Sequence, residues 1–141
     1  MPLTVVLDSN ILFRILISQG DILEIVFNSQ LDLLAPLKLK EEFERHKKEL
    51  LSKTKLSEKR FDTFVQLIFK RITFVPLEEY KVSLPKAKQL LKNHSKDEEF
   101  IALCVSKGCK LWTYEVLLFN IGFGISTKEV STELKKLSDA V

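Results

Sequence analysis

Four carboxylate side chains lie at or near one edge of the predicted sheet, three of them where the chain passes from one predicted element to the next. Asp8 directly follows the apolar run of residues 3–7, and Glu115 follows the short run KLWT. Asp97 opens the apolar helical segment KDEEFIALC, and Glu42 lies one turn into a heavily charged helical segment. Each one alone has an ordinary explanation, because carboxylates cap helices and solvate charged helical faces. Together, they are a candidate set of metal ligands.

An oxygen-only set of ligands favours particular cations. Carboxylates that gather in one place repel one another, and the repulsion costs stability unless a cation neutralises it. Oxygen ligands without histidine or cysteine suit Mg²⁺ or Mn²⁺ better than Zn²⁺. The expected cofactor is therefore Mg²⁺ or Mn²⁺.

Short apolar runs alternate with helical patterns along the chain. Strands are expected at residues 3–7, 31–35, 72–75 and 110–113. Helices are expected at residues 11–20, 22–26, 37–51, 56–69, 84–93, 97–107 and 126–137. This alternation predicts an α/β sandwich around a mainly parallel sheet. Ligands of such sheets collect at the carboxyl ends of the strands, which is where Asp8 stands.

Composition limits the class of protein. The chain has 141 residues, of which 45% are hydrophobic and 29% charged, and this excludes a disordered or fibrous chain. No stretch approaches the roughly 20 apolar residues of a membrane span, and the amino terminus lacks a signal-peptide pattern. Cys104 and Cys109 are too few for a disulfide framework and are expected to be buried thiols. We expect one domain over residues 1–141, located in the cytoplasm, with no membrane partner.

Basic side chains concentrate between residues 45 and 60. The net charge of +3 is too small to indicate nucleic-acid binding by itself. A local patch can still neutralise several phosphates, although an ordinary solvated helical face has the same composition. The candidate RNA-binding residues in this stretch are Arg45, Lys47, Lys48 and Lys53.

The order of these motifs resembles that of the PIN-domain family of metal-dependent ribonucleases. The similar segments are VVLDSNIL, APLKLKEEF, KDEEFIAL and LWTYE, and they extend over nearly the whole chain. The resemblance implies a PIN-like three-layer α/β/α sandwich with a mainly parallel central sheet. It also implies an endoribonuclease that cleaves single-stranded RNA with water activated by a divalent metal.

The resemblance assigns roles to the four acids. Asp8, Glu42 and Asp97 match the first three acids of the family and would hold one metal ion, as catalytic residues. Family members normally carry Asp at the fourth position, where this chain has Glu115. Glutamate keeps the ligand chemistry and is longer by one methylene, so Glu115 is expected to help directly or through a water molecule.

Other residues near these acids have expected supporting roles. Asn10 and Thr113 have the polar side chains that orient carboxylate ligands, with turn or cap hydrogen bonds as the alternative. We interpret Trp112 as a core residue and leave base stacking by Tyr114 as an option. No histidine is expected to replace the metal-activated water as a general base.

The resemblance also suggests partners. Many small relatives are toxins that an antitoxin protein neutralises, and family members often form homodimers. The expected partners are therefore RNA, an antitoxin and a second copy of the chain. Phe13, Ile17 and Phe27 would allow a dimer if they were exposed, although core positions are expected for Ile17 and Phe27.

Two alternatives remain beside the ribonuclease. The first is a PIN-like module that binds RNA or a protein without cleaving, which the substitution of Glu115 for Asp favours. The second is a phosphotransfer enzyme with Asp8 as its nucleophile. That chemistry needs a second Asp two residues later, and this chain has Asn10 there.

Overall fold

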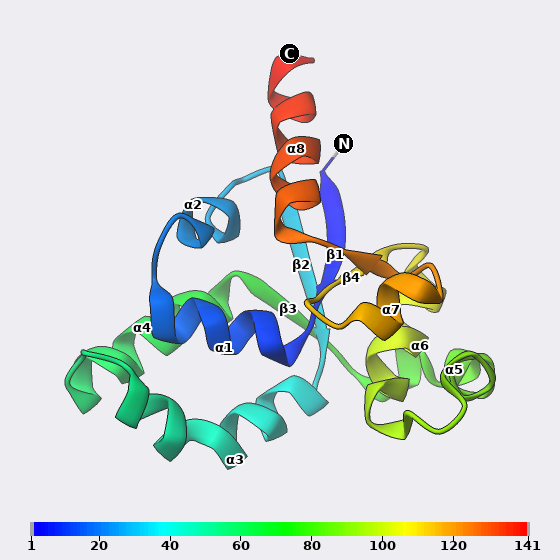
Figure 1. Cartoon of the computed structure of the whole chain (residues 1–141), viewed down its shortest axis with the longest axis horizontal. Helices are drawn as coiled ribbons and strands as arrows, with labels where there is room; N and C mark the ends of the chain where they lie inside the picture. Colours follow the sequence, from blue (N-terminus) through cyan, green and yellow to red (C-terminus); the bar gives the residue numbers. More distant parts are fainter. Residues whose placement is uncertain (1, 141) are drawn as a thin grey trace.

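A sheet of five parallel strands forms the centre of the molecule (Figure 1). The structure is a computed structural model that describes residues 2–140. The strand order is β3-β2-β1-β4-β5, and every neighbouring pair is parallel. The strands are β1 (Leu3–Leu7), β2 (Leu31–Pro36), β3 (Ile72–Val75), β4 (Lys110–Trp112) and β5 (Gly124–Ile125). The predicted mainly parallel sheet is confirmed.

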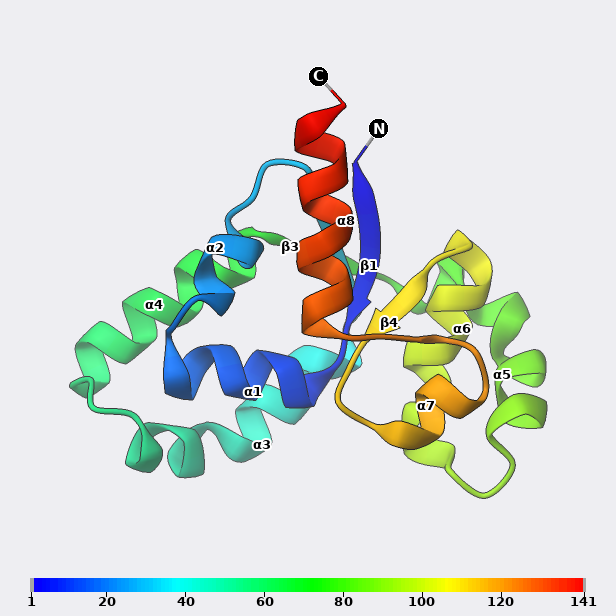
Figure 2. The same ribbon diagram turned by 45° about the horizontal axis from the view of Figure 1, so that its top comes forward.

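Helices cover both faces of this sheet. On one side lie α1 (Ser9–Ser18), α2 (Ile22–Val26), α3 (Lys38–Lys53) and α4 (Glu58–Lys70). On the other side α6 (Glu98–Lys107) packs across β1, β2 and β4, and α5 (Leu84–Leu91) packs on α6. Figure 2 shows the last helix, α8 (Thr127–Asp139), alongside β1. The three-layer sandwich is thus confirmed.

The core follows from the apolar patterns of these elements. In α1 the side chains of Ile11, Leu12, Ile15 and Leu16 are fully buried, as their helical spacing predicts. Trp112 is also fully buried, and its indole N–H donates to the hydroxyl of Thr127 at 2.9 Å. This hydrogen bond allows a polar ring nitrogen to lie in the core, and the prediction for Trp112 is confirmed.

Two elements at the edge of the sheet were not predicted. Strand β5 has only two residues and helix α7 (Val116–Asn120) only five, so neither shows a measurable period. Gly124 allows them to pack together, because a Cβ atom there would lie 2.7 Å from the ring of Phe119. The sheet therefore has one strand more than the sequence pattern indicates.

Two burial expectations are wrong. Phe27 ends α2 with 47% of its surface exposed instead of lying in the core. Cys109 is only partly buried, whereas Cys104 on α6 is fully buried as expected. Among the described residues, no helix combines the length and the apolar character needed to cross a bilayer.

Candidate metal centre

The pairing of the two central strands brings Asp8 and Thr113 together. Leu7 at the end of β1 is in register with Trp112 at the end of β4. The next residue of each strand therefore projects from the same edge of the sheet, and the backbone N–H of Asp8 donates to the carbonyl of Trp112 at 3.1 Å. Residues 105 positions apart in the sequence become neighbours in this way.

Three of the four predicted carboxylates meet at this edge. One carboxylate oxygen from each of Asp8, Asp97 and Glu115 lies within 4.8 Å of the others. Asp97 reaches the group because it precedes α6, which crosses the strands. Asp8 and Asp97 are only 2% and 4% exposed, and Glu115 is half-buried. The longer side chain of Glu115 thus still brings its carboxylate to the group.

Hydrogen bonds fix the orientation of Asp8. The Thr113 hydroxyl donates to Oδ2 of Asp8 at 2.6 Å, and the backbone N–H of Ser9 donates to Oδ1 at 2.8 Å. The Thr113 oxygen in turn accepts from the backbone N–H of Glu115 at 3.1 Å and from the Asn10 amide at 3.4 Å. Asp8 is also the N-cap residue of α1, so the same side chain caps a helix and belongs to the candidate metal site.

Asp97 lacks such support. Its Oδ2 is buried and, among the described residues, has no hydrogen-bond partner. Burial first, and then the negative charges of Glu115 and Asp8, raise the pKa of Asp97 to about 7. A buried carboxylate oxygen without a donor is costly, and a cation at this point would remove the cost.

The pKa of Asp8 is also raised, though less than that of Asp97. Burial raises its pKa to about 6, and the charges of Glu115 and Glu42 add to the rise. The hydrogen bonds from Thr113 and Ser9 oppose it, because they stabilise the ionised form. The donor set is oxygen only, so the residues present fit a divalent cation such as Mg²⁺ or Mn²⁺.

Glu42 lies near this group without joining it. It is not among the three carboxylates that come within 4.8 Å of one another. It lines the same cleft, which has a volume of about 330 Å³ and also contains Asp97 and Glu115. A direct bond from Glu42 to an ion that the trio holds therefore stays a prediction.

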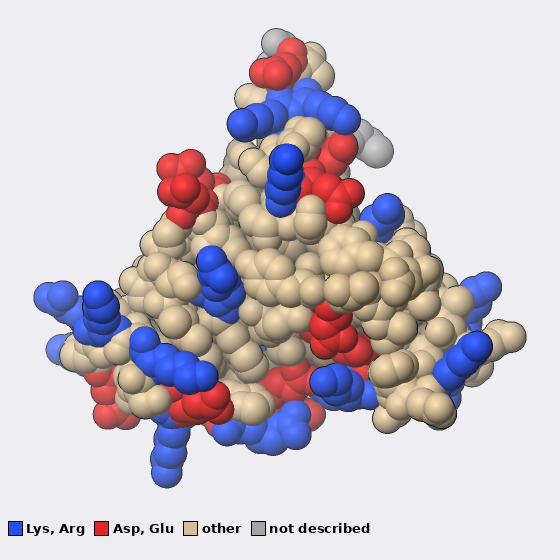
Figure 3. Space-filling model, viewed as in Figure 1, with Lys and Arg blue, Asp and Glu red and all other residues tan. Residues whose placement is uncertain are grey.

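The rim of the cleft is basic. Lys38, Arg45 and Lys96 line it together with the acids, and the Lys38 ammonium donates to the backbone carbonyl of Lys96 at 2.6 Å. In Figure 3, acidic side chains gather between the α1–α3 and α6–α7 parts of the molecule, with basic side chains beside them. An acidic floor with a cationic rim suits a metal ion together with a polyanion.

Lys38, Lys96 and His46 line the cleft without having been predicted as residues of this site. His46 lines the cleft, and the expectation that no histidine replaces the metal-activated water as a general base stays a prediction. The spacing of four residues from Lys38 to Glu42 to His46 places all three on one face of α3, and that signal was available in the sequence. Lys96 gave no comparable signal, because its position depends on how the segment before α6 folds.

The predicted RNA-binding residues differ in their surroundings. Lys47 on α3 forms an ion pair with Asp62 on α4 at 3.2 Å, and Lys53 pairs with Glu49 at 3.0 Å. Arg45 and Lys48 are exposed, and only Arg45 of the four also lines the cleft. Arg45 is therefore the member of the set closest in placement to the acids.

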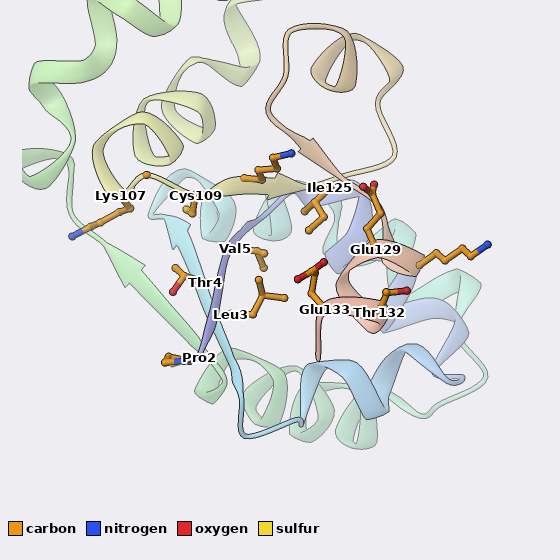
Figure 4. Close-up of a pocket in the computed structure, with 13 residues that line it drawn as sticks. Pro2, Leu3, Thr4, Val5, Lys107, Cys109, Ile125, Glu129, Thr132 and Glu133 are labelled. Atoms are coloured by element: carbon orange, nitrogen blue, oxygen red, sulfur yellow. The ribbon is translucent and has the colours of Figure 1, made fainter. Parts of the chain in front are cut away.

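A larger pocket lies elsewhere in the molecule. It has a volume of about 630 Å³ and is bounded by the first residues of β1 and β4 and by α8 (Figure 4). Its lining includes Leu3, Val5 and Glu133 but none of the four predicted acids. Chemistry identifies the candidate site better than volume does, because the unpartnered carboxylate oxygen is in the smaller cleft.

A parallel sheet covered by helices, with functional side chains at the carboxyl ends of its strands, defines the class of α/β proteins that bind their ligands at this edge. The PIN domain family model matches residues 6–135, and the chain belongs to this family. A comparison with curated proteins finds no match. PIN domains are generally nucleases that use divalent metals, and the acidic cluster at the sheet edge fits such a site.

Proposed function

We propose that this protein is an Mg²⁺- or Mn²⁺-dependent endoribonuclease that hydrolyses phosphodiester bonds of single-stranded RNA. The observation that carries the proposal is the meeting of Asp8, Asp97 and Glu115 within 4.8 Å, with one buried oxygen of Asp97 left without a partner. These three residues would hold the metal, and Glu42 would assist from the cleft wall. When bound, the metal would supply a nucleophilic water and offset charge on the leaving oxygen.

The chain's own residues have separate tasks in this proposal. Thr113 and the backbone of Ser9 hold Asp8 in one orientation, so the ligand geometry is set before substrate arrives. Lys38, Arg45 and Lys96 at the rim attract the phosphate backbone towards an acidic floor that would otherwise repel it. The acidic trio therefore needs both its cation and its basic rim in order to accept RNA.

The first prediction tests the trio directly. Asp8→Asn and Asp97→Asn should each lower the rate of RNA cleavage in Mn²⁺ by at least about 100-fold, because each removes a charged metal ligand. Asp32→Asn is the matched control. Asp32 lies near the start of β2 and interacts with Thr4 at 3.3 Å, at the opposite end of the sheet from the trio.

Cleavage of a labelled single-stranded RNA is measured in gels, and circular dichroism checks the fold of each variant. If the Asp8 and Asp97 variants are folded and cleave RNA as fast as wild type, the proposed mechanism is wrong. A wild type that binds RNA but never cleaves it in Mn²⁺ or Mg²⁺ would instead support the binding module as the function.

The partners are part of the same proposal. An antitoxin protein that covers the cleft would block access to the trio, as the family resemblance implies for a toxin. Exposed Phe27 gives α2 an apolar surface that a second copy of the chain would bury in a homodimer. Size-exclusion chromatography with light scattering measures the oligomeric state of wild type and Phe27→Ser, and a monomer for both would contradict the dimer.

A further inference from the structure

The metal centre does not account for two aromatic rings that lie beside it. Phe13 on α1 and His46 on α3 have ring centroids 5.3 Å apart, with planes inclined at 57°. Both residues line the cleft that contains Asp97 and Glu115. Two helices therefore bring a pair of rings to the wall of the candidate active site.

In this pair the Phe13 ring is held in place by packing, and the His46 ring is accessible to solvent. Phe13 is partly buried and packs against the hydrophobic core, which restricts its movement. The His46 side chain remains 47% exposed. Its Nδ1 lies 3.5 Å from a carboxylate oxygen of Glu49, and Glu49 is held in turn by Lys53 at 3.0 Å. The imidazole is thus supported on one side and open to solvent on the other.

The charges around the pair suit the remaining parts of a nucleotide. Lys38, Arg45 and Lys96 line the same cleft and provide positive charge for phosphates. The rings provide a flat apolar surface, which a base can cover with its π-face. A nucleotide whose phosphate lies near the trio and the rim would therefore find these two rings in the same cleft.

We propose that Phe13 and His46 form a stacking site for an unpaired nucleobase of the nucleic acid substrate. The inference rests on the proposed function, because it concerns the substrate of the same cleft. Stacking of a base on an aromatic side chain changes affinity by about 5- to 150-fold. A base within a duplex would first have to leave its stack, so the site favours single strands.

The test measures binding and does not depend on cleavage. Fluorescence anisotropy gives the affinity of the full chain for labelled RNA and DNA oligonucleotides in EDTA, and again with Ca²⁺. Each oligonucleotide is compared with versions that lack one base at successive positions. In the wild type, loss of one particular base should weaken binding by about 5- to 150-fold.

Substitutions then assign this loss to the two rings. Phe13→Leu and His46→Ala should weaken binding of the intact oligonucleotide and remove the effect of the missing base. His46→Phe should retain both, because it keeps a flat ring without the imidazole nitrogens. Phe64→Leu and His94→Ala are the matched controls, because Phe64 is partly buried like Phe13, His94 is exposed like His46, and neither lines the cleft.

Circular dichroism confirms the fold of every variant. The proposal is overturned if the ring variants bind like their controls, or if His46→Phe behaves like His46→Ala. A missing-base effect in RNA, DNA or both supports the site and names the nucleic acid that it accepts, and no effect in either overturns it. Failure of the nuclease proposal would appear separately, as absence of Mn²⁺-dependent cleavage with the base effect intact.

Discussion

At the scale of single residues, the two buried carboxylates of Asp8 and Asp97 differ in their hydrogen bonds. Both oxygens of Asp8 accept a hydrogen bond, one from the Thr113 hydroxyl and one from the backbone of Ser9. Asp97 has a buried oxygen with no partner among the described residues. Asp8 is therefore oriented by the protein itself, whereas Asp97 depends on something that the cleft would bind.

Thr113 offers a test of this orientation. Thr113→Val keeps the shape of the side chain and removes the hydroxyl that joins Asp8, Asn10 and the backbone of Glu115. We expect the affinity for Mn²⁺ to fall by about 10- to 100-fold, as for other residues that orient metal ligands. Isothermal titration calorimetry measures the affinity, and Thr113→Ser should stay close to wild type.

The matched control for this change is Thr132→Val, which alters an exposed threonine on α8. Equal Mn²⁺ affinities for Thr113→Val and wild type would show that the hydroxyl has no part in positioning Asp8.

The sequence allowed some residues of the site to be located and not others. Asp8 and Asp97 stand at element boundaries, so a pattern of apolar runs was enough to place them near one sheet edge. His46 follows Glu42 by four residues on one face of α3, so the sequence could have placed it. Lys96 lines the cleft because the segment before α6 converges there with α3. That convergence depends on tertiary packing, which local patterns do not contain.

At the scale of elements, Arg71 joins the end of α4 to the connection between α2 and β2. Its guanidinium donates to the carbonyls of Val26 and Asn28 at 2.9 Å each and to that of Leu31 at 3.2 Å. These carbonyls belong to the last residue of α2, the connection that follows it and the first residue of β2. A single planar side chain thus fixes the entry into β2.

We predict that Arg71→Met lowers the free energy of unfolding by about 1.5–3 kcal/mol, because charge-assisted hydrogen bonds to three carbonyls are lost. Methionine retains most of the apolar stem, so the change reports mainly on the guanidinium. Urea unfolding measures the effect, and Lys70→Met, at an exposed neighbouring position, should change stability by less than about 0.5 kcal/mol. Equal losses in the two variants would contradict the role of Arg71.

Element prediction succeeded where local signals were strong. The capping box of Ser126 and Glu129 begins α8, and Gly108 ends α6 in the left-handed conformation, both as the sequence indicates. Strand β5 has no such signal, since two residues cannot show alternation. Its place depends on the contact between Gly124 and Phe119, which only the folded chain reveals.

At the scale of the whole molecule, Asp8 and Asp97 link the stability of the fold to pH. The pKa values of Asp8 and Asp97 in the folded chain are about 6 and about 7, above the ordinary value of 3.8. At pH values between 3.8 and these raised pKa values, the folded state binds more protons than the unfolded state. The metal-free protein should therefore be most stabilised by these groups near pH 4 and lose that stability as pH rises to 7.

For Asp8 the loss amounts to about 3 kcal/mol. Thermal unfolding in EDTA between pH 4.5 and 8 measures the combined effect of Asp8 and Asp97. Mn²⁺ should restore stability most strongly at the upper end of this range, because the ligands are then ionised. Asp97→Asn should flatten the pH dependence in EDTA and raise stability at pH 8 above that of metal-free wild type. A wild type whose stability in EDTA falls from pH 5 to 8 no more steeply than that of the variant would contradict the assignment.

The hydrogen bond between Asp8 and Thr113 spans 105 positions of the sequence. Under the proposed function, a growing polypeptide contains no complete metal site until Thr113 and Glu115 have been synthesised. During the earlier part of translation, the ribosome and the messenger RNA that encodes this nuclease would therefore not be exposed to its activity.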